Sequence, residues 1–553
     1  MQAIRVALAN ALKKLDITVE SADVHLEFPG ELSNGDYASN VALMYAKTAG
    51  MAPKALAEKI AAGLGAIEGV ANAAVAGPGF INFSLSSSAI ASVVDTAGHS
   101  NDWGKADSRK GEKIMVEYTD PNPFKEFHIG HLMSNAIGEA TSRLLDFTGA
   151  EVKRANYQGD VGPHVAKAIW GVQKLGVDAS NAKELGKAYT AGAEAYENDP
   201  RAKEEIDAIN AKVYNRSDTA INDIYDAGRK ASLEHFEEIY KTLGTQFDFM
   251  FFESKSAPRG METVKAHPEV FEQSDGALVF KGEKYNLHTR VFVTSKGLPT
   301  YEAKDLGLIQ LKAEAWKYDT SITVTATEQK EYFKVVLAAM KEVLPELAAK
   351  VRHVSHGMMR LAEGKMSSRK GNVITGESLL ADLTEAALER AKTSRASDAG
   401  ELAKQIAVGA IKYQILKQAS GKDITFDRER SLSLEGDSGP YLQYAHARAC
   451  AVLEKAKGLG IEAKADTGAE PNDVGRLIPR FPDIVARAAK EMEPHLVTNY
   501  LLELVSTFNR WYAQEHILDD GPNVAHKLAI VEAFRTTVKN GLWVLAIPSP
   551  EKM

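Results

Sequence analysis

The chain contains 553 residues, of which 44% are apolar and 25% are charged, and its formal net charge is −8. This length predicts two to four domains, and the single cysteine, Cys450, excludes an intrachain disulfide and a zinc site built from cysteines. The acidic balance gives no global sign of nucleic-acid binding. It does not exclude RNA, because local basic patches rather than the net charge determine that binding.

Residues 1–108 are typical of a small, separate α/β domain. Residues 1–17 are amphipathic and lack the unbroken apolar stretch and the cleavage site of a secretion signal. Residues 31–64 carry Ala, Leu and Val at helical spacing, and residues 74–86 predict the end of a strand. With the single cysteine, the absence of a secretion signal predicts a cytoplasmic protein. Because the chain has no run of 18 apolar residues, we also predict that it does not span a membrane.

A strand that leads into a helix is predicted between residues 114 and 145. Residues 114–118 form a short apolar strand, a Pro/Asn turn follows, and apolar residues then recur at helical spacing. His128, Gly130 and His131 stand at the start of this helix, which in an open parallel sheet faces the crevice beyond the strand. Histidines can bind phosphate oxygens, and Gly130 lets a flat base approach the backbone. The same residues equally fit an ordinary helix start, so both interpretations stay open at this point.

The region from about 109 to 400 predicts a parallel sheet with a helical insertion. Residues 151–171 indicate a second strand and a Gly-rich turn into another helix. Residues 175–245 are rich in Ala, Lys and Glu, with a break at residues 198–200. We expect them to form an inserted helical hairpin that serves as solvated scaffold.

Tyr301 and Asp305 are four residues apart, so they share one face of a predicted helix. A tyrosine ring beside a carboxylate suits a planar cation, because a guanidinium can stack on the ring and form a forked pair with the carboxylate. A core tyrosine next to a surface aspartate is the other interpretation of this spacing. Farther along, residues 365–372 hold three cations among small residues, a pattern that suits closure over a polyphosphate but is also common in solvated turns.

Beyond about residue 401 the pattern is helical, which predicts an all-α bundle over residues 401–553. Its segment 441–448 alternates aromatic rings with polar side chains. Such side chains can stack on and hydrogen-bond splayed single-stranded bases, although packing in a bundle explains them as well.

Taken together, residues 121–131 and 365–371 resemble the HIGH and KMSKS signatures of class I aminoacyl-tRNA synthetases. Residues 35–40 and 77–82 are similar to phrases of the N-terminal additional domain of arginyl-tRNA synthetases, and the C-terminal region resembles their anticodon-binding domain. The resemblance is colinear over nearly the whole chain. It implies a Rossmann-type α/β catalytic domain with a parallel sheet, an N-terminal α/β domain that contacts the tRNA elbow, and a C-terminal all-α anticodon-binding bundle.

The resemblance also implies the residues of the active site. The expected catalytic residues are Lys125, His128, His131, Lys365 and Lys370. The expected ATP-binding residues are His128, Gly130, His131, Gly357, Met358, Lys365, Met366 and Ser367. The expected arginine-binding residues are Asn122, Glu151, Asn156, Tyr301, Asp305, Gln329 and Glu253. The expected tRNA-binding residues are Tyr441, Gln443, Tyr444, His446 and Arg448.

Three positions depart from the family pattern. Val161 stands where a Trp is usual, Met133 where an Arg is common, and Ser368 where the second lysine of the loop is expected. We hypothesise that Lys125, just before the first histidine, is the compensating cation for the ATP phosphates.

The resemblance implies an arginine–tRNA ligase that acts in translation on ATP, L-arginine and tRNA(Arg), as a monomer. Magnesium is expected on the ATP phosphates, with no prosthetic group and no dedicated metal site. A cysteinyl-tRNA synthetase shares the layout but needs thiolates that this chain does not have. A non-catalytic RNA-binding relative is the second alternative, and the presence together of His128, Gly130, His131, Lys365 and Asp305 argues against it. A general adenylyltransferase built on the same histidine turn would lack the C-terminal bundle.

Overall fold

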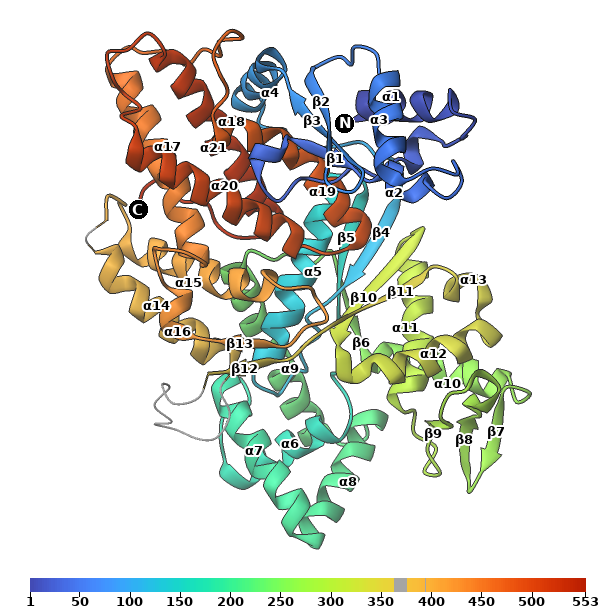
Figure 1. The fold of residues 1–553 in the computed structure, drawn as a ribbon. Helices are drawn as coiled ribbons and strands as arrows, with labels where there is room; N and C mark the ends of the chain where they lie inside the picture. The colour runs from blue at the N-terminus through green and yellow to red at the C-terminus, as the bar shows by residue number, and fades with distance from the viewer. Residues whose placement is uncertain (363–374, 393) are drawn as a thin grey trace.

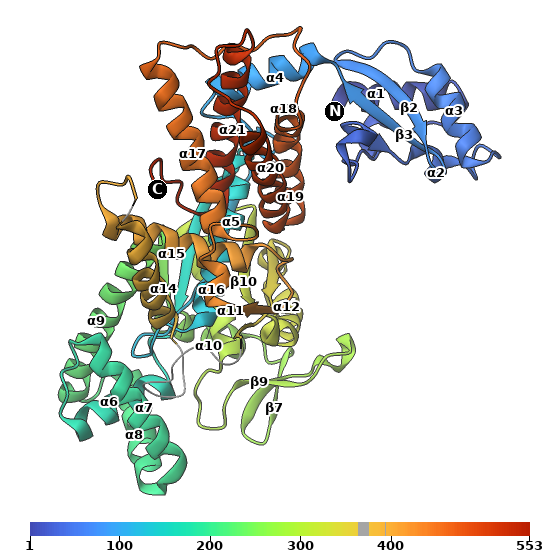
Figure 2. The same cartoon turned by 60° about the vertical axis from the view of Figure 1, so that its left-hand side comes forward.

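The computed structural model describes residues 1–362, 375–392 and 394–553. A parallel sheet forms its centre, with a helical insertion at one end and a helical bundle at the other (Figure 1). The N-terminal domain stands beside the bundle, as Figure 2 shows most clearly. Within these ranges, no helix combines the length and apolar character needed to cross a membrane.

The N-terminal domain is an antiparallel sheet in the order β1-β3-β2, packed against helices. Its elements are α1 Gln2–Lys13, η1 Ser21–Asp23, η2 Leu32–Asn34, β1 Tyr37–Ser39, α2 Val41–Tyr45, α3 Pro53–Gly63, β2 Val70–Ala76 and β3 Phe80–Leu85. Arg476 of the bundle ties this domain down, since its Nε lies 2.8 Å from Asp36 Oδ1. Helix α4 (Ser87–His99) packs on the bundle helix α21 (Val524–Val544), so the predicted unit 1–108 ends in a helix that shares the bundle's core.

The catalytic sheet has five parallel strands in the order β11-β10-β4-β5-β6, which confirms the predicted Rossmann-type fold. The strands are β4 Lys113–Glu117, β5 Glu151–Gln158, β6 Phe249–Phe252, β10 Thr320–Ala326 and β11 Val351–His356. The chain order reverses between β4 and β10. A doubly wound sheet forms its ligand crevice at the carboxyl ends of the strands on either side of such a reversal.

Helices cover both faces of the sheet because β4 is apolar on both sides. Ile114 and Val116 pack in one core with α5 (Ile129–Phe147), and Met115 packs in the opposite core. The helices of that second face are α10 Glu253–Ala266, α11 Tyr301–Ala315, α12 Lys330–Val343 and α13 Pro345–Ala348. A small antiparallel sheet stands before α11 and consists of β7 Phe271–Ser274, β8 Ala277–Phe280 and β9 Arg290–Val293. The 3-10 helix η3 Gly282–Tyr285 connects β8 to β9.

The insertion is larger than the hairpin that the sequence predicts. It contains α6 Pro163–Leu175, α7 Ala182–Asn198, α8 Pro200–Asn215 and α9 Thr219–Leu243, which enclose a core of their own. Its inner face is also more than solvated scaffold. Phe124 of the turn after β4 is buried against it: its backbone N–H donates to Ser232 Oγ at 2.9 Å and its ring stacks on Tyr225.

The C-terminal region is helical, as predicted. Its elements are α14 Gly376–Ala391, α15 Ala399–Leu416, α16 Arg428–Ser431, α17 Gly439–Gly458, α18 Asp473–Leu477, η5 Ile478–Arg480, α19 Phe481–Glu491, α20 His495–Gln514 and α21. Two short strands, β12 Met359–Leu361 and β13 Ile424–Phe426, pair in parallel and join this region to the end of the sheet.

Candidate active site

The turn between β4 and α5 is an unusual piece of backbone. Thr119, Asp120 and Phe124 have φ values of 79°, 48° and 69°, which residues with side chains rarely adopt. Hydrogen bonds hold it in place: the Thr119 N–H donates to Ser134 Oγ at 2.9 Å, and Asp120 Oδ1 accepts from the Tyr157 N–H at 2.7 Å. Strained backbone that its surroundings fix in this way is a common feature of active sites.

The two histidines close the start of α5. His128 is the residue before the helix, and its backbone N–H donates to His131 Nδ1 at 3.1 Å. The rings stack with centroids 3.5 Å apart, and Gly130 leaves the space that the His128 ring uses, because a Cβ there would lie 3.0 Å from it.

The surroundings of both histidines favour the neutral form of the ring. Burial lowers the pKa of His131 well below its ordinary value, with help from His128 and Lys125, and burial and Lys125 also lower the pKa of His128. Since His131 Nδ1 accepts a hydrogen bond, the proton of the neutral ring is on Nε2. His131 therefore offers one N–H donor from a buried position.

Lys125 lies on the same turn and contacts the insertion. Its ammonium stands 5.0 Å from the centroid of the Tyr189 ring of α7, within the range of a cation–π interaction. The charge of Lys125 also helps burial to lower the pKa of the neighbouring His164, to about 3. A half-buried cation thus stands next to the two histidines, where the hypothesis of a phosphate-neutralising lysine requires it.

Acids gather behind the turn at the carboxyl edge of the sheet. Glu117, at the end of β4, is buried and paired with the buried Lys312 at 2.5 Å. Asp305 accepts a hydrogen bond from the Tyr332 hydroxyl at 2.6 Å and lines a cavity of about 30 Å³ with Glu117 and Lys312. Burial is the largest influence on the pKa of Asp305 and, together with Glu117, raises it to about 7. Burial and Glu117 also raise the pKa of Asp120 well above its ordinary value.

A second group of predicted residues lies beside these acids. A Cβ on Gly159 would come within 2.2 Å of Asn122 Oδ1 and 3.1 Å of Glu253 Oε1, so these two side chains meet over Gly159. Glu253 is buried, and it forms an ion pair with Lys304 at 2.5 Å. Lys304 in turn lies 4.9 Å from the centroid of the Tyr301 ring. The structure thereby brings Asn122, Glu253 and Tyr301 together.

The other expected pocket residues divide into two groups. Asn156 is fully buried near the carboxyl end of β5 and donates to the Tyr240 hydroxyl at 3.2 Å, while Gln329 is exposed at the end of η4 (Thr327–Gln329), directly after β10. The prediction that Glu151 lies in the arginine pocket is wrong. Glu151 begins β5, opposite Lys113 at the start of β4, and its exposed side chain lies at the amino edge of the sheet, away from the crevice.

The basic loop, residues 365–372, lies outside the described residues, and only the residues that flank it are described. Lys365, Met366, Ser367, Ser368 and Lys370 belong to this loop. Thr375 forms an antiparallel bridge with His128, and the Gly376 N–H donates to Phe127 O at 2.7 Å. On the other side, buried Gly357 and exposed Met358 follow β11 directly. Described residues on either side of the loop thus reach the carboxyl edge of the sheet, and Thr375 touches the histidine turn itself.

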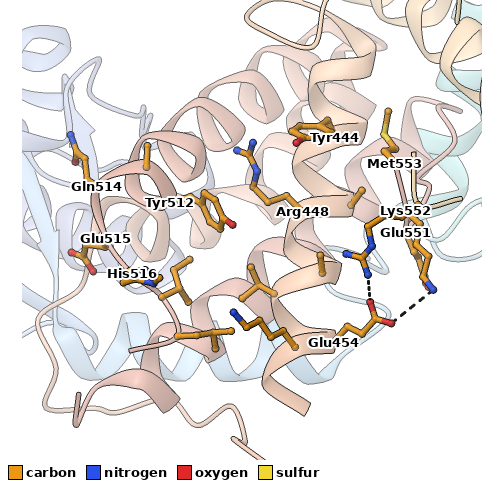
Figure 3. A pocket seen from close by; sticks show the side chains of 18 residues that line it. Tyr444, Arg448, Glu454, Tyr512, Gln514, Glu515, His516, Glu551, Lys552 and Met553 are labelled. Carbon is orange, nitrogen blue, oxygen red and sulfur yellow. Dashed lines mark hydrogen bonds and ion pairs between the residues drawn. The ribbon is translucent and has the colours of Figure 1, made fainter. Parts of the chain in front are cut away.

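The expected tRNA-binding residues point in different directions on α17. Tyr444 and Arg448 line a cavity of about 850 Å³ with Tyr512 and the C-terminal Met553 (Figure 3), and the Arg448 guanidinium lies 4.8 Å from both tyrosine ring centroids. Tyr441 is half-buried nearby on the same helix.

Gln443 and His446 are corrections to this set. Both are buried, and they hold the C-terminal tail: Gln443 Nε2 donates to Pro548 O at 2.9 Å, and His446 Nδ1 lies 2.9 Å from Pro550 O. Packing against the tail leaves neither side chain free to meet a base.

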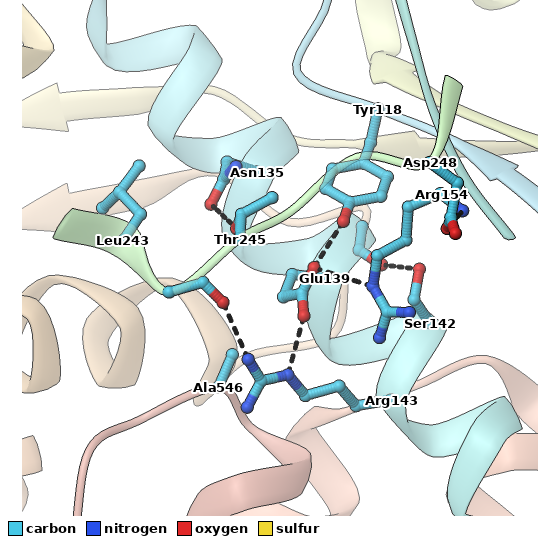
Figure 4. Close-up of polar contacts among 12 residues, drawn as sticks. Tyr118, Asn135, Glu139, Ser142, Arg143, Arg154, Leu243, Thr245, Asp248 and Ala546 are labelled. Atoms are coloured by element: carbon cyan, nitrogen blue, oxygen red, sulfur yellow. Dashed lines mark hydrogen bonds and ion pairs between the residues drawn. The ribbon is translucent and has the colours of Figure 1, made fainter. Parts of the chain in front are cut away.

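Arg143 and Lys412 join three regions at the far end of α5. Arg143 donates to Glu139 (Figure 4). It also donates to Gly244 O just after α9 and to Trp543 O near the end of α21. The buried Lys412 of α15 donates to Leu243 O at 2.5 Å and to Ala546 O at 2.9 Å. The helix that begins at the histidines therefore ends where the insertion and the bundle meet.

Four residues of the site were not predicted from the sequence: Glu117, Asp120, Lys304 and Lys312. Glu117 could have been recognised from the sequence, because it is a charged residue that follows an apolar run in the strand directly before the turn. The two lysines could not, since their carboxylates are far away in sequence. Across the parts of the chain that the structure covers, no three His, Cys, Asp or Glu side chains are grouped as metal ligands.

Three family models match consecutive parts of the chain. Residues 2–85 match the arginyl tRNA synthetase N terminal domain, residues 94–428 the catalytic domain of class I (R) tRNA synthetases, and residues 442–553 the DALR anticodon binding domain. An arginine–tRNA ligase of Clostridioides difficile is 31% identical over 576 aligned residues, which cover 100% of both chains.

The chain belongs to the arginyl-tRNA synthetase family. An arginine–tRNA ligase of Limosilactobacillus reuteri is also 31% identical, over 100% of this chain and 99% of the relative. The solved arginyl-tRNA synthetase of Thermus thermophilus superposes with a TM-score of 0.79 at 25% identity, over 99% of each chain. The predicted class I fold with its N-terminal and C-terminal domains is therefore confirmed.

Proposed function

We propose that this member of the arginyl-tRNA synthetase family is an arginine–tRNA ligase, which uses ATP to activate L-arginine and transfers the arginyl group to tRNA(Arg). The observation that carries the proposal is an acid beside the nucleotide turn that forms no ion pair among the described residues. Glu117 and Glu253 are neutralised by buried lysines, whereas Asp305 has only the Tyr332 hydroxyl as partner in the described ranges. A guanidinium, which cannot shed its charge, is the ligand that such a carboxylate suits best.

In the first step, an oxygen of the arginine carboxylate attacks the α-phosphorus of ATP. The bond from that phosphorus to the bridging oxygen breaks, and pyrophosphate leaves with the electron pair. His131 Nε2–H and the His128 ring supply hydrogen bonds to the phosphate oxygens, and the Lys125 ammonium offsets the charge on them. The protein forms no covalent bond, so positioning and charge stabilisation account for its effect on rate.

In the second step, a hydroxyl of the terminal tRNA ribose attacks the carbonyl carbon of arginyl-adenylate and AMP leaves. Tyr444 and Arg448 suit the anticodon end of the tRNA, because rings and a guanidinium can stack on unpaired bases. The N-terminal domain stands beside the bundle, which suits a contact with the tRNA elbow.

Further parts of the proposal concern the setting of the reaction. Magnesium enters with ATP on its phosphates and belongs to the substrate rather than to the protein. The enzyme acts as a monomer in the cytoplasm. Lys365 and Lys370 of the basic loop serve the pyrophosphate side of ATP.

A screen of the twenty amino acids tests the function. Each amino acid is added to the full-length protein with ATP, magnesium and tRNA, and exchange of labelled pyrophosphate into ATP is measured. We expect exchange with arginine alone, at a rate that Asp305→Asn lowers at least tenfold. Exchange with a different amino acid would contradict the assignment. Absence of exchange with all twenty, from a protein that still binds tRNA, would instead favour the non-catalytic RNA-binding relative.

A further inference from the structure

Lys304 occupies a position in the candidate arginine pocket that the two chemical steps do not use. It lies on α11 between Tyr301 and Asp305, and its side chain is only 6% exposed. Lysine is rarely buried unless it is paired. Here the Nζ atom lies 2.5 Å from Glu253 Oε2, and the Glu253 side chain is itself buried.

The backbone fixes this ion pair in place. Glu253 begins α10, and α10 packs backbone to backbone on α11. A Cβ on Gly260 would come within 1.8 Å of Ala303 O, and one on Gly307 within 2.0 Å of Ser256 O. Because such close packing requires glycine on both helices, the Lys304 ammonium and the Glu253 carboxylate have little freedom to move apart.

The Lys304 ammonium also lies over the ring of Tyr301, a residue that the sequence predicts to bind the substrate. Lys304 Nζ is 4.9 Å from the centroid of the Tyr301 ring, and Tyr301 remains 57% exposed. A cation–π contact and an ion pair are thus already satisfied inside the pocket. Because Glu253 is already paired with Lys304, a second cation in this pocket must pair with a carboxylate of α11 instead.

That carboxylate is Asp305. Lys312 neutralises Glu117 at 2.5 Å. Asp120 Oδ1 already accepts from the Tyr157 N–H at 2.7 Å, and burial and Glu117 raise the pKa of Asp120 well above its ordinary value. Asp305 has a hydroxyl partner and forms no ion pair with any residue in the described ranges. Among these acids, Asp305 is therefore the one that remains available to pair with the guanidinium of a bound arginine.

We propose that Lys304 is a specificity-determining positioning residue: by occupying Glu253 and the Tyr301 ring, it leaves Asp305 as the single seat for the arginine guanidinium. This inference rests on the proposed arginine activation. Without Lys304, two carboxylates on neighbouring helices compete for one guanidinium. Arginine then binds in two positions, and only one of them presents its carboxylate to ATP.

Non-productive binding has a kinetic signature of its own. It lowers kcat and KM by the same factor and leaves kcat/KM nearly unchanged, unlike the loss of a contact that is made only in the transition state. For Lys304→Met we expect the kcat of arginine-dependent exchange and the KM for arginine to fall together, about tenfold, at pH 8. Lys304→Arg keeps the pair and should stay within threefold of the unaltered protein.

Glu253→Gln makes the opposite change, because it leaves an unpaired ammonium near the substrate cation. The KM for arginine should then rise at least tenfold with little change in kcat. The double variant Lys304→Met/Glu253→Gln removes both the cation and its competitor, and should return kcat and KM to within threefold of the starting values. Lys255→Met is the matched control. Lys255 is an exposed lysine on α10, the helix that also carries Glu253, and its loss should change neither kcat nor KM.

The unaltered protein is measured first, and failure of arginine to support exchange there would count against the proposed function. With that activity present, a rise in KM at constant kcat for Lys304→Met would overturn the inference. So would a double variant as impaired as Lys304→Met. If Lys304→Met does not fold, an unchanged KM in soluble Glu253→Gln overturns it as well, because a purely structural pair would alter the active fraction but not KM.

Discussion

Arginine binding should depend on pH through Asp305. Its pKa is raised to about 7, by burial first and by Glu117 among the charges, while the Tyr332 hydroxyl counteracts the rise. A guanidinium binds to the ionised carboxylate, so binding requires the loss of any proton that Asp305 carries. Affinity should therefore be highest well above pH 7 and fall as the pH drops below it.

The size of the effect follows from the position of that pKa. With a pKa of about 7, about nine-tenths of Asp305 is ionised at pH 8 and about one-tenth at pH 6. The dissociation constant for arginine should thus rise about tenfold between pH 8 and pH 6, which corresponds to about 1.4 kcal/mol. Burial and neighbouring positive charge lower the pKa of both active-site histidines, so their titration moves towards acid pH while that of Asp305 moves towards neutral pH.

Calorimetric titration of arginine into the full-length protein between pH 6 and pH 8.5, without ATP, measures this dependence. Tyr332→Phe is the matched variant. It removes the hydroxyl that lowers the pKa of Asp305, so the midpoint of the pH dependence should move upward. Asp305→Asn should bind weakly and without dependence on pH. A dissociation constant that stays constant from pH 6 to pH 8, or a Tyr332→Phe midpoint that moves downward, would refute the reasoning.

Three further changes test other parts of the molecule. Lys125→Ala should lower the kcat of exchange about 100-fold, because it removes a cation that stabilises the charge developing on the phosphates. Its affinity for arginine, measured by calorimetry, should not change. An unchanged kcat would exclude Lys125 as the substitute for the loop lysine. Arg448→Ala should raise the KM for tRNA about tenfold in arginylation assays, with arginine affinity unchanged, since stacking on a base contributes about 1–3 kcal/mol. Burial lowers the pKa of Lys412 to about 7, so its proton is bound more weakly in the folded than in the unfolded state. Chemical denaturation measures the free energy of unfolding of the unaltered protein and of Lys412→Met. As the pH rises from 7 to 9, the value for the unaltered protein should increase by about 1–3 kcal/mol relative to the variant. A difference that stays constant would show that the lysine remains charged.

The nucleotide turn could be predicted because all its parts are local. An apolar strand, a turn rich in Pro and Asn and an amphipathic helix follow one another within about thirty residues, and β4 and α5 occupy those positions. What the sequence could not supply is the way in which the turn is held. Ser232, which accepts from the Phe124 N–H, is 108 residues away in an insertion that the sequence indicates only as helical.

The error at Glu151 could have been avoided from strand direction alone. Asn156 stands near the carboxyl end of β5, and residue 151 precedes it by five positions. At about 3.3 Å per residue, the two side chains are about 16 Å apart along the strand. One pocket at the carboxyl edge of the sheet cannot include both.

The errors on α17 have the same character. His446 is four residues after Leu442 and three before Ala449, so it shares the buried face of the helix with them. Tyr444 and Arg448 are four apart on another face, which lines the cavity. Helical spacing therefore separates the packing residues from the accessible ones. The tail that Gln443 and His446 hold lies about a hundred residues away, beyond the reach of any local pattern.

Basic side chains form polar contacts near both ends of α5, and those at its far end connect the insertion and the bundle to this helix. At the start of the helix, buried lysines neutralise Glu117 and Glu253. At its far end, Arg143 and Lys412 face the carbonyl oxygens at the ends of α9 and α21, where the helix dipoles are negative. The 19 residues of α5 form a stiff rod of about 28 Å. Any movement of the bundle against the insertion must therefore break these bonds or displace the rod, and a displaced rod moves the two histidines at its other end.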